Sequence, residues 1–339
     1  VSPAILAPLQ LPPLILLRRL GLAELKPVEA IDTQLIPEFA ANASLFAGLC
    51  DSFDLLLAER LLQRGHPLQL VLPYRPDRLL EATRLRLGND WAERLEHCLQ
   101  SAAHVHAERG FLEHEMGWAA GNVTERALGL ALLAASRGGG SLHIVDVDPR
   151  QQPPYTSAPT CLEADATLAA AALGRLYQQE PAATAPNGRR MVGLIFADFA
   201  GFQRLEDTLL PQFWNGPMRA IAQFLTRHGN RVLHKNTWGD ALHVVTDDAS
   251  TAASIMADIQ HYMTLQRLKP DAPLAGLTLR IAGHYAPAYE SFDPIHGART
   301  YFGTQLSLAA RIEPVTPPGQ IYATEAFAAR LVVEGADQF

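Results

Sequence analysis

Cysteine is scarce in this sequence. Among 339 residues there are three cysteines, Cys50, Cys98 and Cys161, and no two of them form a CxxC pair. An odd number of widely spaced cysteines excludes a disulfide framework as the basis of the fold, and the spacing does not suit a zinc site. Free thiols are typical of a reducing compartment, so we expect a cytoplasmic protein.

A long uninterrupted apolar run is also missing. The apolar segment near the beginning of the chain is broken by Pro3, Pro8, Pro12 and Pro13, and no small-residue cleavage site follows it. Prolines at these positions prevent one continuous helix. No other stretch reaches the length of about 20 apolar residues that a spanning helix needs. We therefore expect no membrane partner.

An excess of positive charge is the third absence. The formal net charge is −7 and the sequence pI is about 5.9. This balance argues against a large phosphate-neutralising surface, so we expect no nucleic-acid partner, whereas a local basic pocket for one triphosphate stays compatible with it. With 48% hydrophobic and 19% charged residues, the composition is that of a soluble globular protein.

The length and one linker predict two domains. A chain of 339 residues exceeds the usual size of one core. Periodic pattern gives way to proline, alanine and polar residues in QQEPAATAPNGRR, residues 178–190. We therefore predict one domain over 1–178, a linker over 179–190 and a second domain over 191–339.

The first half alternates between helical and strand patterns. Helices are predicted at 54–64, 88–100 and 124–136, and buried strands at 67–73 and 141–147. Such alternation predicts an α/β fold with a Rossmann-like parallel sheet. The cluster HVHAERGFLEHE at 104–115 is rich in histidine and glutamate, but it fits no closed zinc set and is interpreted as a solvated helix face.

Residues 48–148 resemble the SLOG-type, nucleotide-sensing half of bacterial proteins that join such a domain to a cyclase domain. The segments GLCDSFDLLLAERLLQRGHPLQLVLPYRPDRL and GNDWAERLEHCL carry this resemblance. The glycine-rich phosphate loop of the dinucleotide-binding fingerprint is absent from the sequence. A ligand-binding role and a packing or dimerisation role both stay open for this half.

Two aspartates mark the second half. Asp198 ends an apolar strand and is followed by a turn at Gly201. The segment RVLHKNTWGDALHVV predicts a hairpin with its turn at Trp238 and Gly239 and a second strand that opens with Asp240. If these strands share one sheet, the two carboxylates reach a common edge. Two carboxylates at one edge are compatible with a site for two divalent metal ions.

The pieces FADFAGF, NTWGD, RIAGH, YFG, AARIE and GQIYATE, in this order, resemble the class III adenylyl/guanylyl cyclase family. The resemblance implies a ferredoxin-like βαββαβ core and a homodimer whose active sites are shared between subunits. It also implies conversion of a nucleoside triphosphate to a 3′,5′-cyclic nucleotide and pyrophosphate with two Mg or Mn ions.

Residue by residue, the resemblance implies that Asp198 and Asp240 hold the metals. The backbone of Phe199, Ala200, Gly201 and Phe202 would lie along the triphosphate. Arg311 matches the arginine that stabilises the phosphorane from the partner subunit, and Ser307 stands where the family has an assisting asparagine. The family's triphosphate-binding lysine would fall beyond Phe339, so phosphate binding relies on residues past that point or on other basic groups.

The base-reading positions depart from the family pattern. Asn236 replaces the lysine or glutamate four residues before Asp240, and Thr300 occupies the partner position. An amide complements the N3–H and O4 edge of uracil, and Trp238, Tyr301 and Phe302 are bulky enough to exclude a purine's second ring. Pyrimidine cyclases of bacterial anti-phage signalling use this domain with altered base readers. UTP is therefore favoured, with ATP and GTP as alternatives.

Two other functions remain open at this point. A cyclase-like module that binds nucleotide without turnover would fit Ser307 and the missing lysine. A purely structural dimerisation protein would leave Asp198 and Asp240 without a role.

Overall fold

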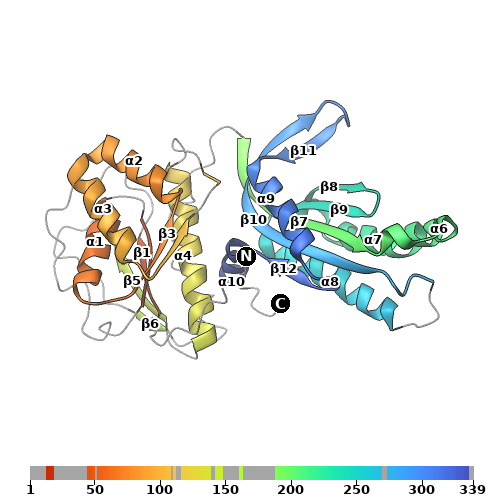
Figure 1. The fold of residues 1–339 in the computed structure, drawn as a ribbon, viewed down its shortest axis with the longest axis horizontal. Helices are drawn as coiled ribbons and strands as arrows, with labels where there is room; N and C mark the ends of the chain where they lie inside the picture. Colours follow the sequence, from red (N-terminus) through yellow and green to blue (C-terminus); the bar gives the residue numbers. More distant parts are fainter. Residues whose placement is uncertain are drawn as a thin grey trace. The chain divides into compact units, whose positions relative to one another are not determined.

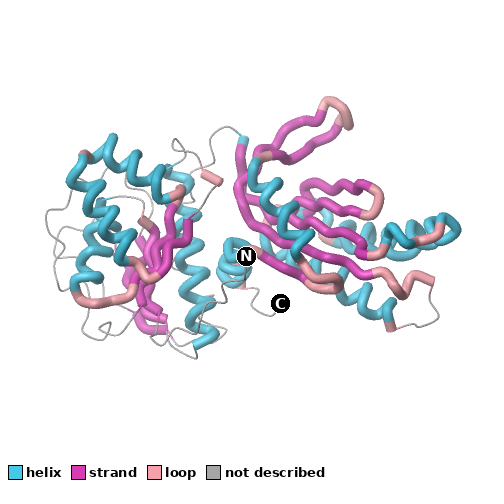
Figure 2. The backbone as a smooth tube through the Cα atoms, in the orientation of Figure 1, coloured by secondary structure: helices cyan, strands magenta, loops and turns pink. Residues whose placement is uncertain are grey.

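The computed structural model describes residues 13–18, 44–49, 52–107, 110–111, 116–138, 142–147, 160–162, 188–268 and 273–335 (Figure 1). Contacts divide the chain into two compact units, 1–184 with 332–335 and 185–331 with 336–339. Each unit has its own sheet (Figure 2). None of the described helices is both long and apolar enough to cross a membrane.

The first unit contains a six-stranded sheet in the order β4-β3-β2-β1-β5-β6. Five strands run parallel, and β6 pairs antiparallel to β5 at one edge. All five residues of β3 are buried, as expected for a strand inside a parallel sheet. The strands are β1 Pro13–Arg18, β2 Ser44–Gly48, β3 Leu68–Leu72, β4 His104–Ala107, β5 Leu142–Val147 and β6 Thr160–Leu162.

Four helices accompany this sheet: α1 Ser52–Gln63, α2 Pro76–Leu87, α3 Asn89–Ser101 and α4 Met116–Gly138. The predictions of α1 and α3 are confirmed, whereas α4 begins eight residues before the predicted start at 124. The sequence pattern missed α2, although Pro76 in its first turn and Gly88 after its end, at φ 100°, are ordinary helix boundaries.

The interpretation of residues 104–115 as a helix face is wrong where the structure describes it. His104–Ala107 forms the strand β4, and His106 is buried with its Nε2 3.3 Å from Gln69 Oε1. Alternation of polar and apolar residues over four positions is a strand pattern, and pairing with β3 fixes it. Residues 108–109 and 112–115 lie outside the described part.

The second unit has the element order βαββαβ, formed by β7, α7, β8, β9, α8 and β10. Its sheet runs β11-β10-β7-β9-β8, so these four strands take the order 4-1-3-2 of a ferredoxin-like core. The elements are β7 Arg189–Ala200, α7 Arg219–Arg227, β8 Val232–Trp238, β9 Ala241–Thr246, α8 Ala249–Arg267, β10 Thr278–Asp293 and β11 Ala298–Phe302.

Three further elements follow this core: α9 Thr304–Ile312, β12 Ile321–Ala323 and α10 Glu325–Val333. Between β7 and α7 the chain forms the short helix α6 Leu210–Phe213. Helices α7 and α8 pack on one face of the sheet, where Ile195, Phe224 and Ile255 belong to one buried core. Helix α9 covers part of the other face through Ala309 (Figure 1).

After its first residue, Leu277, the segment LTLRIAGHYAPAY lies within the single long strand β10. Of the sixteen residues of β10, Thr278–Tyr289 pair with β7. On its other edge β10 pairs with β12 up to Gly283 and with β11 from Tyr289 onward. Pro287 falls between these two ladders, where its missing N–H interrupts no pairing on that edge. A proline in the sequence therefore did not end the strand.

Helix α8 approaches β7 so closely that only glycine fits at position 193. A Cβ there would lie 2.6 Å from the backbone oxygen of Asp248 and 3.1 Å from Ala252 Cβ, and it would also collide with Thr246 Oγ1. Asp248 caps α8 by accepting a hydrogen bond from Thr251 N at 2.6 Å. The clash is therefore with backbone that a cap holds in place.

We expect Gly193→Ala to destabilise the protein by about 1–3 kcal/mol, because the helix or the strand must move to admit the methyl group. Gly216→Ala is the matched control, since a Cβ there meets nothing within 4 Å. Urea unfolding followed by circular dichroism measures both. Equal midpoints for Gly193→Ala and Gly216→Ala would contradict the close approach of α8.

Candidate active site

Asp198 lies near the end of β7, and the chain after it is tightly anchored. Phe199 is buried in the core, and its ring meets Phe213 edge-on at 4.8 Å. Gly201 turns the chain at φ 95°, a conformation that side chains disfavour, and Phe202 packs on the other side of Phe213 at 4.9 Å. The aromatic contacts fix both ends of the turn that follows Asp198.

Asp240 lies in the two-residue turn between β8 and β9. Gly239 takes φ 66° in this turn, and β9 begins at the next residue, Ala241. Asp240 is thus a turn residue and does not open the strand as the sequence pattern predicted. Ala241 pairs directly with Asp198 across the β7–β9 ladder. Asp240 is therefore one residue from the cross-strand neighbour of Asp198.

The two carboxylates interact. Burial raises the pKa of Asp198 above its ordinary value, and the charge of Asp240 and a hydrogen bond to it raise that pKa further. Arg280 acts in the opposite direction, since it pairs with Asp198 on the other neighbouring strand, β10. Asp198 thus lies between a carboxylate on one side and a guanidinium on the other.

A third acid belongs to the same neighbourhood. Glu313 follows α9 at the start of a short 3₁₀ turn. Burial raises its pKa, as does the negative charge of Asp198 and of Asp240, while Arg280 lowers it. Its Oε1 is buried without a hydrogen-bond partner in the described part of the chain. We call Asp198, Asp240, Glu313 and Arg280 the carboxylate cluster.

The sequence pattern did not single out Arg280 or Glu313. A signal existed for each, because Arg280 is a charged residue inside the otherwise apolar strand LTLRIAGH, and Glu313 ends the motif AARIE. Their proximity to Asp198 depends on the register of β7 with β10 and on the path of the chain after α9. Neither of these can be read from local periodicity.

The carboxylate cluster fits a divalent cation that is shared with a phosphate. Within the described residues, no three His, Cys, Asp or Glu side chains are arranged to hold a metal by themselves. Mg²⁺ is usually held by one or two carboxylates together with substrate phosphates. Asp198 and Asp240 supply two such groups, and their mutual repulsion is what a bound cation would relieve.

Comparisons with known proteins give a limited result. No protein-family model matches the chain, and no curated protein matches it. Similar solved structures include the guanylyl cyclase domain of the RhoGC fusion protein from Blastocladiella emersonii (20% identity, 42% of this chain and 85% of that one, TM-score 0.36). Others are an adenylate cyclase from Trypanosoma brucei (22%, 47% and 83%, TM-score 0.37) and the adenylyl cyclase CyaB from P. aeruginosa (19%, 42% and 80%, TM-score 0.36).

These likenesses cover less than half of the chain at low identity.

Helix α9 carries Ser307 and Arg311, and both side chains are exposed. In the described part of the chain, neither is joined to the carboxylate cluster by a hydrogen bond or an ion pair. The structure thus brings Asp198 and Asp240 together within one chain but leaves Arg311 free to meet a group outside it.

The base-reading candidates lie on two different strands. Asn236 is on β8, and its Oδ1 accepts a hydrogen bond from Thr237 N at 2.8 Å. Thr300 is on β11 opposite Ser291. His234 Nδ1 lies 3.0 Å from the Arg299 carbonyl oxygen, which joins these two strands. Within the described residues, the amide N–H groups of Asn236 donate no hydrogen bond.

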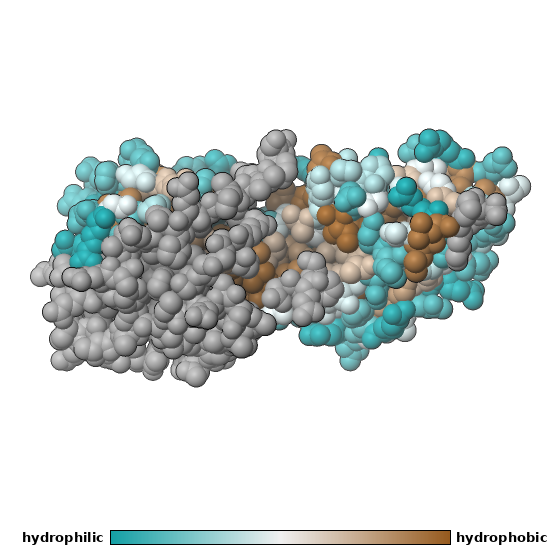
Figure 3. Space-filling view, turned by 90° about the horizontal axis from the view of Figure 1, so that it is seen from below, coloured by the Kyte–Doolittle hydropathy of each residue, from teal (hydrophilic) through white to brown (hydrophobic). Residues whose placement is uncertain are grey.

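Of the three bulky residues beside these candidates, two are exposed. Trp238 is 61% exposed and Phe302 is 51% exposed, whereas Tyr301 is 3% exposed. Tyr301 donates a hydrogen bond to Glu290 Oε2 at 2.6 Å, which with burial raises the pKa of Tyr301 to about 12. Tyr301 is therefore too buried to fill space beside a base, contrary to the expectation from the sequence. Figure 3 shows apolar residues interrupting the hydrophilic surface of the second unit.

One stability prediction follows from the pKa of Asp198. Because this pKa is raised above 3.8, the folded state holds the proton more tightly than the unfolded chain, and the ionised group lowers stability at pH above the folded pKa. We expect Asp198→Asn to raise the melting temperature of the metal-free protein by about 1–3 °C at pH 7. The gain should shrink as the pH falls toward 4.

Differential scanning calorimetry with and without Mn²⁺ measures this effect. Mn²⁺ should stabilise the wild type and leave Asp198→Asn unchanged. Asp258→Asn is the control, since Asp258 pairs with Arg227 at 3.6 Å and its loss should bring no gain. If the metal-free wild type were more stable than Asp198→Asn at pH 7, the ionised Asp198 would not be destabilising and the prediction would be wrong.

Proposed function

We propose that this protein is a homodimeric nucleotidyl cyclase, which converts a nucleoside triphosphate to a 3′,5′-cyclic nucleotide and pyrophosphate with two divalent metal ions. The observation that carries the proposal is the close pair of Asp198 and Asp240, flanked by Arg280. A pair of interacting carboxylates on a strand end and a hairpin turn is electrostatically unfavourable until a cation arrives. The order of the sequence motifs, which resembles that of class III cyclases, supports nucleotide cyclisation as the reaction that this cation assists.

In this proposal the chain's residues mainly position and neutralise charge. Asp198 and Asp240 hold the metal ions, and the backbone of Phe199 to Phe202 follows the triphosphate. When bound, the ions supply Lewis acidity to the ribose 3′-hydroxyl and charge neutralisation to the phosphates. The 3′-oxygen then bonds to the α-phosphorus as the bond to pyrophosphate breaks, and the hydroxyl proton leaves to solvent.

Arg280 offers a cation for phosphate binding. It lies in the strand beside Asp198, so its guanidinium is near any phosphate that shares a metal with the carboxylates. A planar guanidinium suits phosphate oxygens because it can bind two of them at once. We therefore include Arg280 among the triphosphate-binding groups.

Arg311 and Ser307 complete the site from the partner subunit in this proposal. Both are exposed on α9, and Arg311 has no ion pair with the described residues of its own chain. An arginine without a local partner can stabilise charge that develops on a phosphoryl group of another subunit's substrate. Ser307 can donate one hydrogen bond in its support.

We propose UTP as the substrate, with ATP and GTP as alternatives. The amide N–H groups of Asn236, whose Oδ1 already accepts from Thr237 N, and the exposed ring of Trp238 support a pyrimidine. By the sequence resemblance, the product would serve as a second messenger, in anti-phage defence for a uridylate cyclase, and the N-terminal Rossmann-like domain would regulate the enzyme. A nucleotide-binding sensor without turnover is the second candidate, because Ser307 is shorter than the asparagine expected there.

The proposal predicts metal-dependent turnover. Incubation with ATP, GTP, CTP or UTP and Mn²⁺ or Mg²⁺ should give one predominant cyclic product by mass spectrometry. Asp198→Ala should lower the rate at least about 1,000-fold, because no other group replaces the carboxylate at the metal. Asp258→Ala, an acid on α8, is the matched control with full activity. Nucleotide binding without any cyclic product would instead favour the sensor.

A second prediction tests the shared site. Asp198→Ala and Arg311→Ala should each be inactive alone, while a mixture of the two should recover activity. Random pairing makes half of the dimers mixed, and each mixed dimer has one intact site, so about a quarter of the wild-type rate is expected. No recovery from refolded or co-expressed mixtures would show that each chain builds its site alone.

A further inference from the structure

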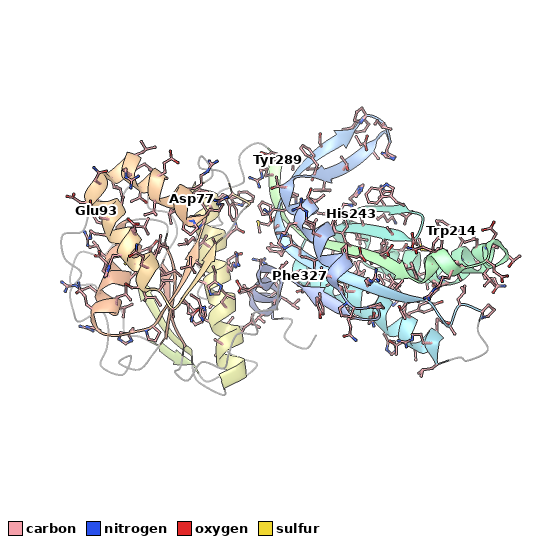
Figure 4. All side chains as sticks on the ribbon, viewed as in Figure 1. Asp77, Glu93, Trp214, His243, Tyr289 and Phe327 are labelled. Atoms are coloured by element: carbon pink, nitrogen blue, oxygen red, sulfur yellow. The ribbon has the colours of Figure 1, made fainter. Side chains whose placement is uncertain are left out.

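His243 lies on the same face of the sheet as Asn236 and Asp198. In antiparallel pairs, residues directly opposite each other project from one face. His243 is opposite Asn236 on β8 and opposite Phe196 on β7. Asp198 is two residues beyond Phe196, and alternate residues of a strand share a face. Figure 4 labels His243 on this sheet.

The His243 ring is enclosed but incompletely bonded. Its side chain is 5% exposed, and Phe196 stacks on it at 4.5 Å between ring centroids. The rings of His234 and Trp238 lie at 5.5 Å and 6.4 Å, the latter nearly parallel to it. Nevertheless, its Nε2 has no hydrogen-bond partner in the described part of the chain. A buried nitrogen without a partner is uncommon in native proteins.

A second buried histidine in the described part of the chain is fully bonded. His284 is also buried, and its two ring nitrogens lie 2.8 Å from Thr324 Oγ1 and 3.1 Å from Gln305 Oε1. His284 is thus held by its own chain, as a structural histidine would be. His243 differs because its buried Nε2 has no hydrogen-bond partner in the described part of the chain. His243 also lies directly opposite Asn236, on the same face of the sheet.

The protonation state of His243 suits hydrogen bonding to a neutral partner. Burial and the neighbouring His234 lower the pKa of His243 to about 4. At neutral pH its ring is therefore uncharged, with one donor and one acceptor nitrogen. A neutral imidazole beside an amide can pair with the donors and acceptors of a nucleobase, whereas a phosphate would favour a cation.

We infer that His243 is a second specificity-determining residue, whose Nε2 hydrogen-bonds the substrate's base next to Asn236. The inference rests on the proposed function and names the base as the part of the nucleotide that Asn236 and His243 contact. Trp238 is exposed at the end of β8, the strand that carries Asn236. Its ring is placed to shift as the base enters and to stack on the base.

Binding of 3′-deoxynucleoside triphosphates tests this inference, because they lack the attacking hydroxyl and cannot turn over. Affinities for 3′-deoxy-UTP, -CTP, -ATP and -GTP are measured with Mg²⁺ by calorimetry. In the wild type we expect one base to be preferred. His243→Phe keeps the ring stack but removes the hydrogen bond, so the preferred nucleotide should bind about 10–100-fold more weakly and the others nearly as before.

His243→Gln should recover most of the lost affinity, because its amide reaches the position of Nε2. His234→Phe is the matched control, since His234 is on the same face but is bonded to the Arg299 carbonyl oxygen. It should leave base preference unchanged. Melting temperatures of all variants identify any that are simply misfolded.

Three results would overturn the inference. A uniform loss of affinity for all four bases in His243→Phe, with a lowered melting temperature, would make His243 a structural residue. Unchanged base preference in His243→Phe would exclude base contact. A wild type that binds none of the four nucleotides with metal would overturn the proposed function as well, which separates that failure from the first two.

Discussion

The antiparallel pairing of β7 with its two neighbours is the constraint on which the candidate site depends. One ladder sets Ala241, and with it Asp240, beside Asp198, while the other sets Arg280 on its opposite side. Because side chains alternate along a strand, a slip of one residue in either ladder would turn one of these groups into the apolar core. The buried residues Ala197 and Phe199, which flank Asp198 on the strand, oppose such a slip. Core packing thus holds the acids in register.

This dependence explains what the sequence could and could not predict. Asp198 and Asp240 stand in short local patterns, a strand before a glycine turn and a hairpin, and the order of the sequence motifs around them made both candidates. Arg280, Glu313 and His243 acquire meaning only from partners far away in the chain. The same limit applies to β10, where Pro287 is tolerated because it falls between the ladders with β11 and β12.

In the first unit, helical periodicity predicted α1 and α3, and alternation predicted a parallel sheet. Strand order was not predictable, because β1 lies between β2 and β5 through long-range pairing that leaves no local signature. The boundary of α4 was misplaced because its first residues, Met116 to Asn122, include two glycines, which are poor helix formers. Tertiary packing against the sheet outweighs that preference.

Alternate residues of each strand lie on opposite faces of the sheet, and this separation has an evolutionary consequence. Along β8 and β9, residues such as Leu242 and Val244 build the core, while Asn236 and His243 occupy the alternate positions. Mutations at these alternate positions leave the core between the sheet and helices α7 and α8 intact. Under the proposed function, descendants of one ancestral chain could therefore exchange one recognised base for another through a few substitutions on the opposite face of the sheet.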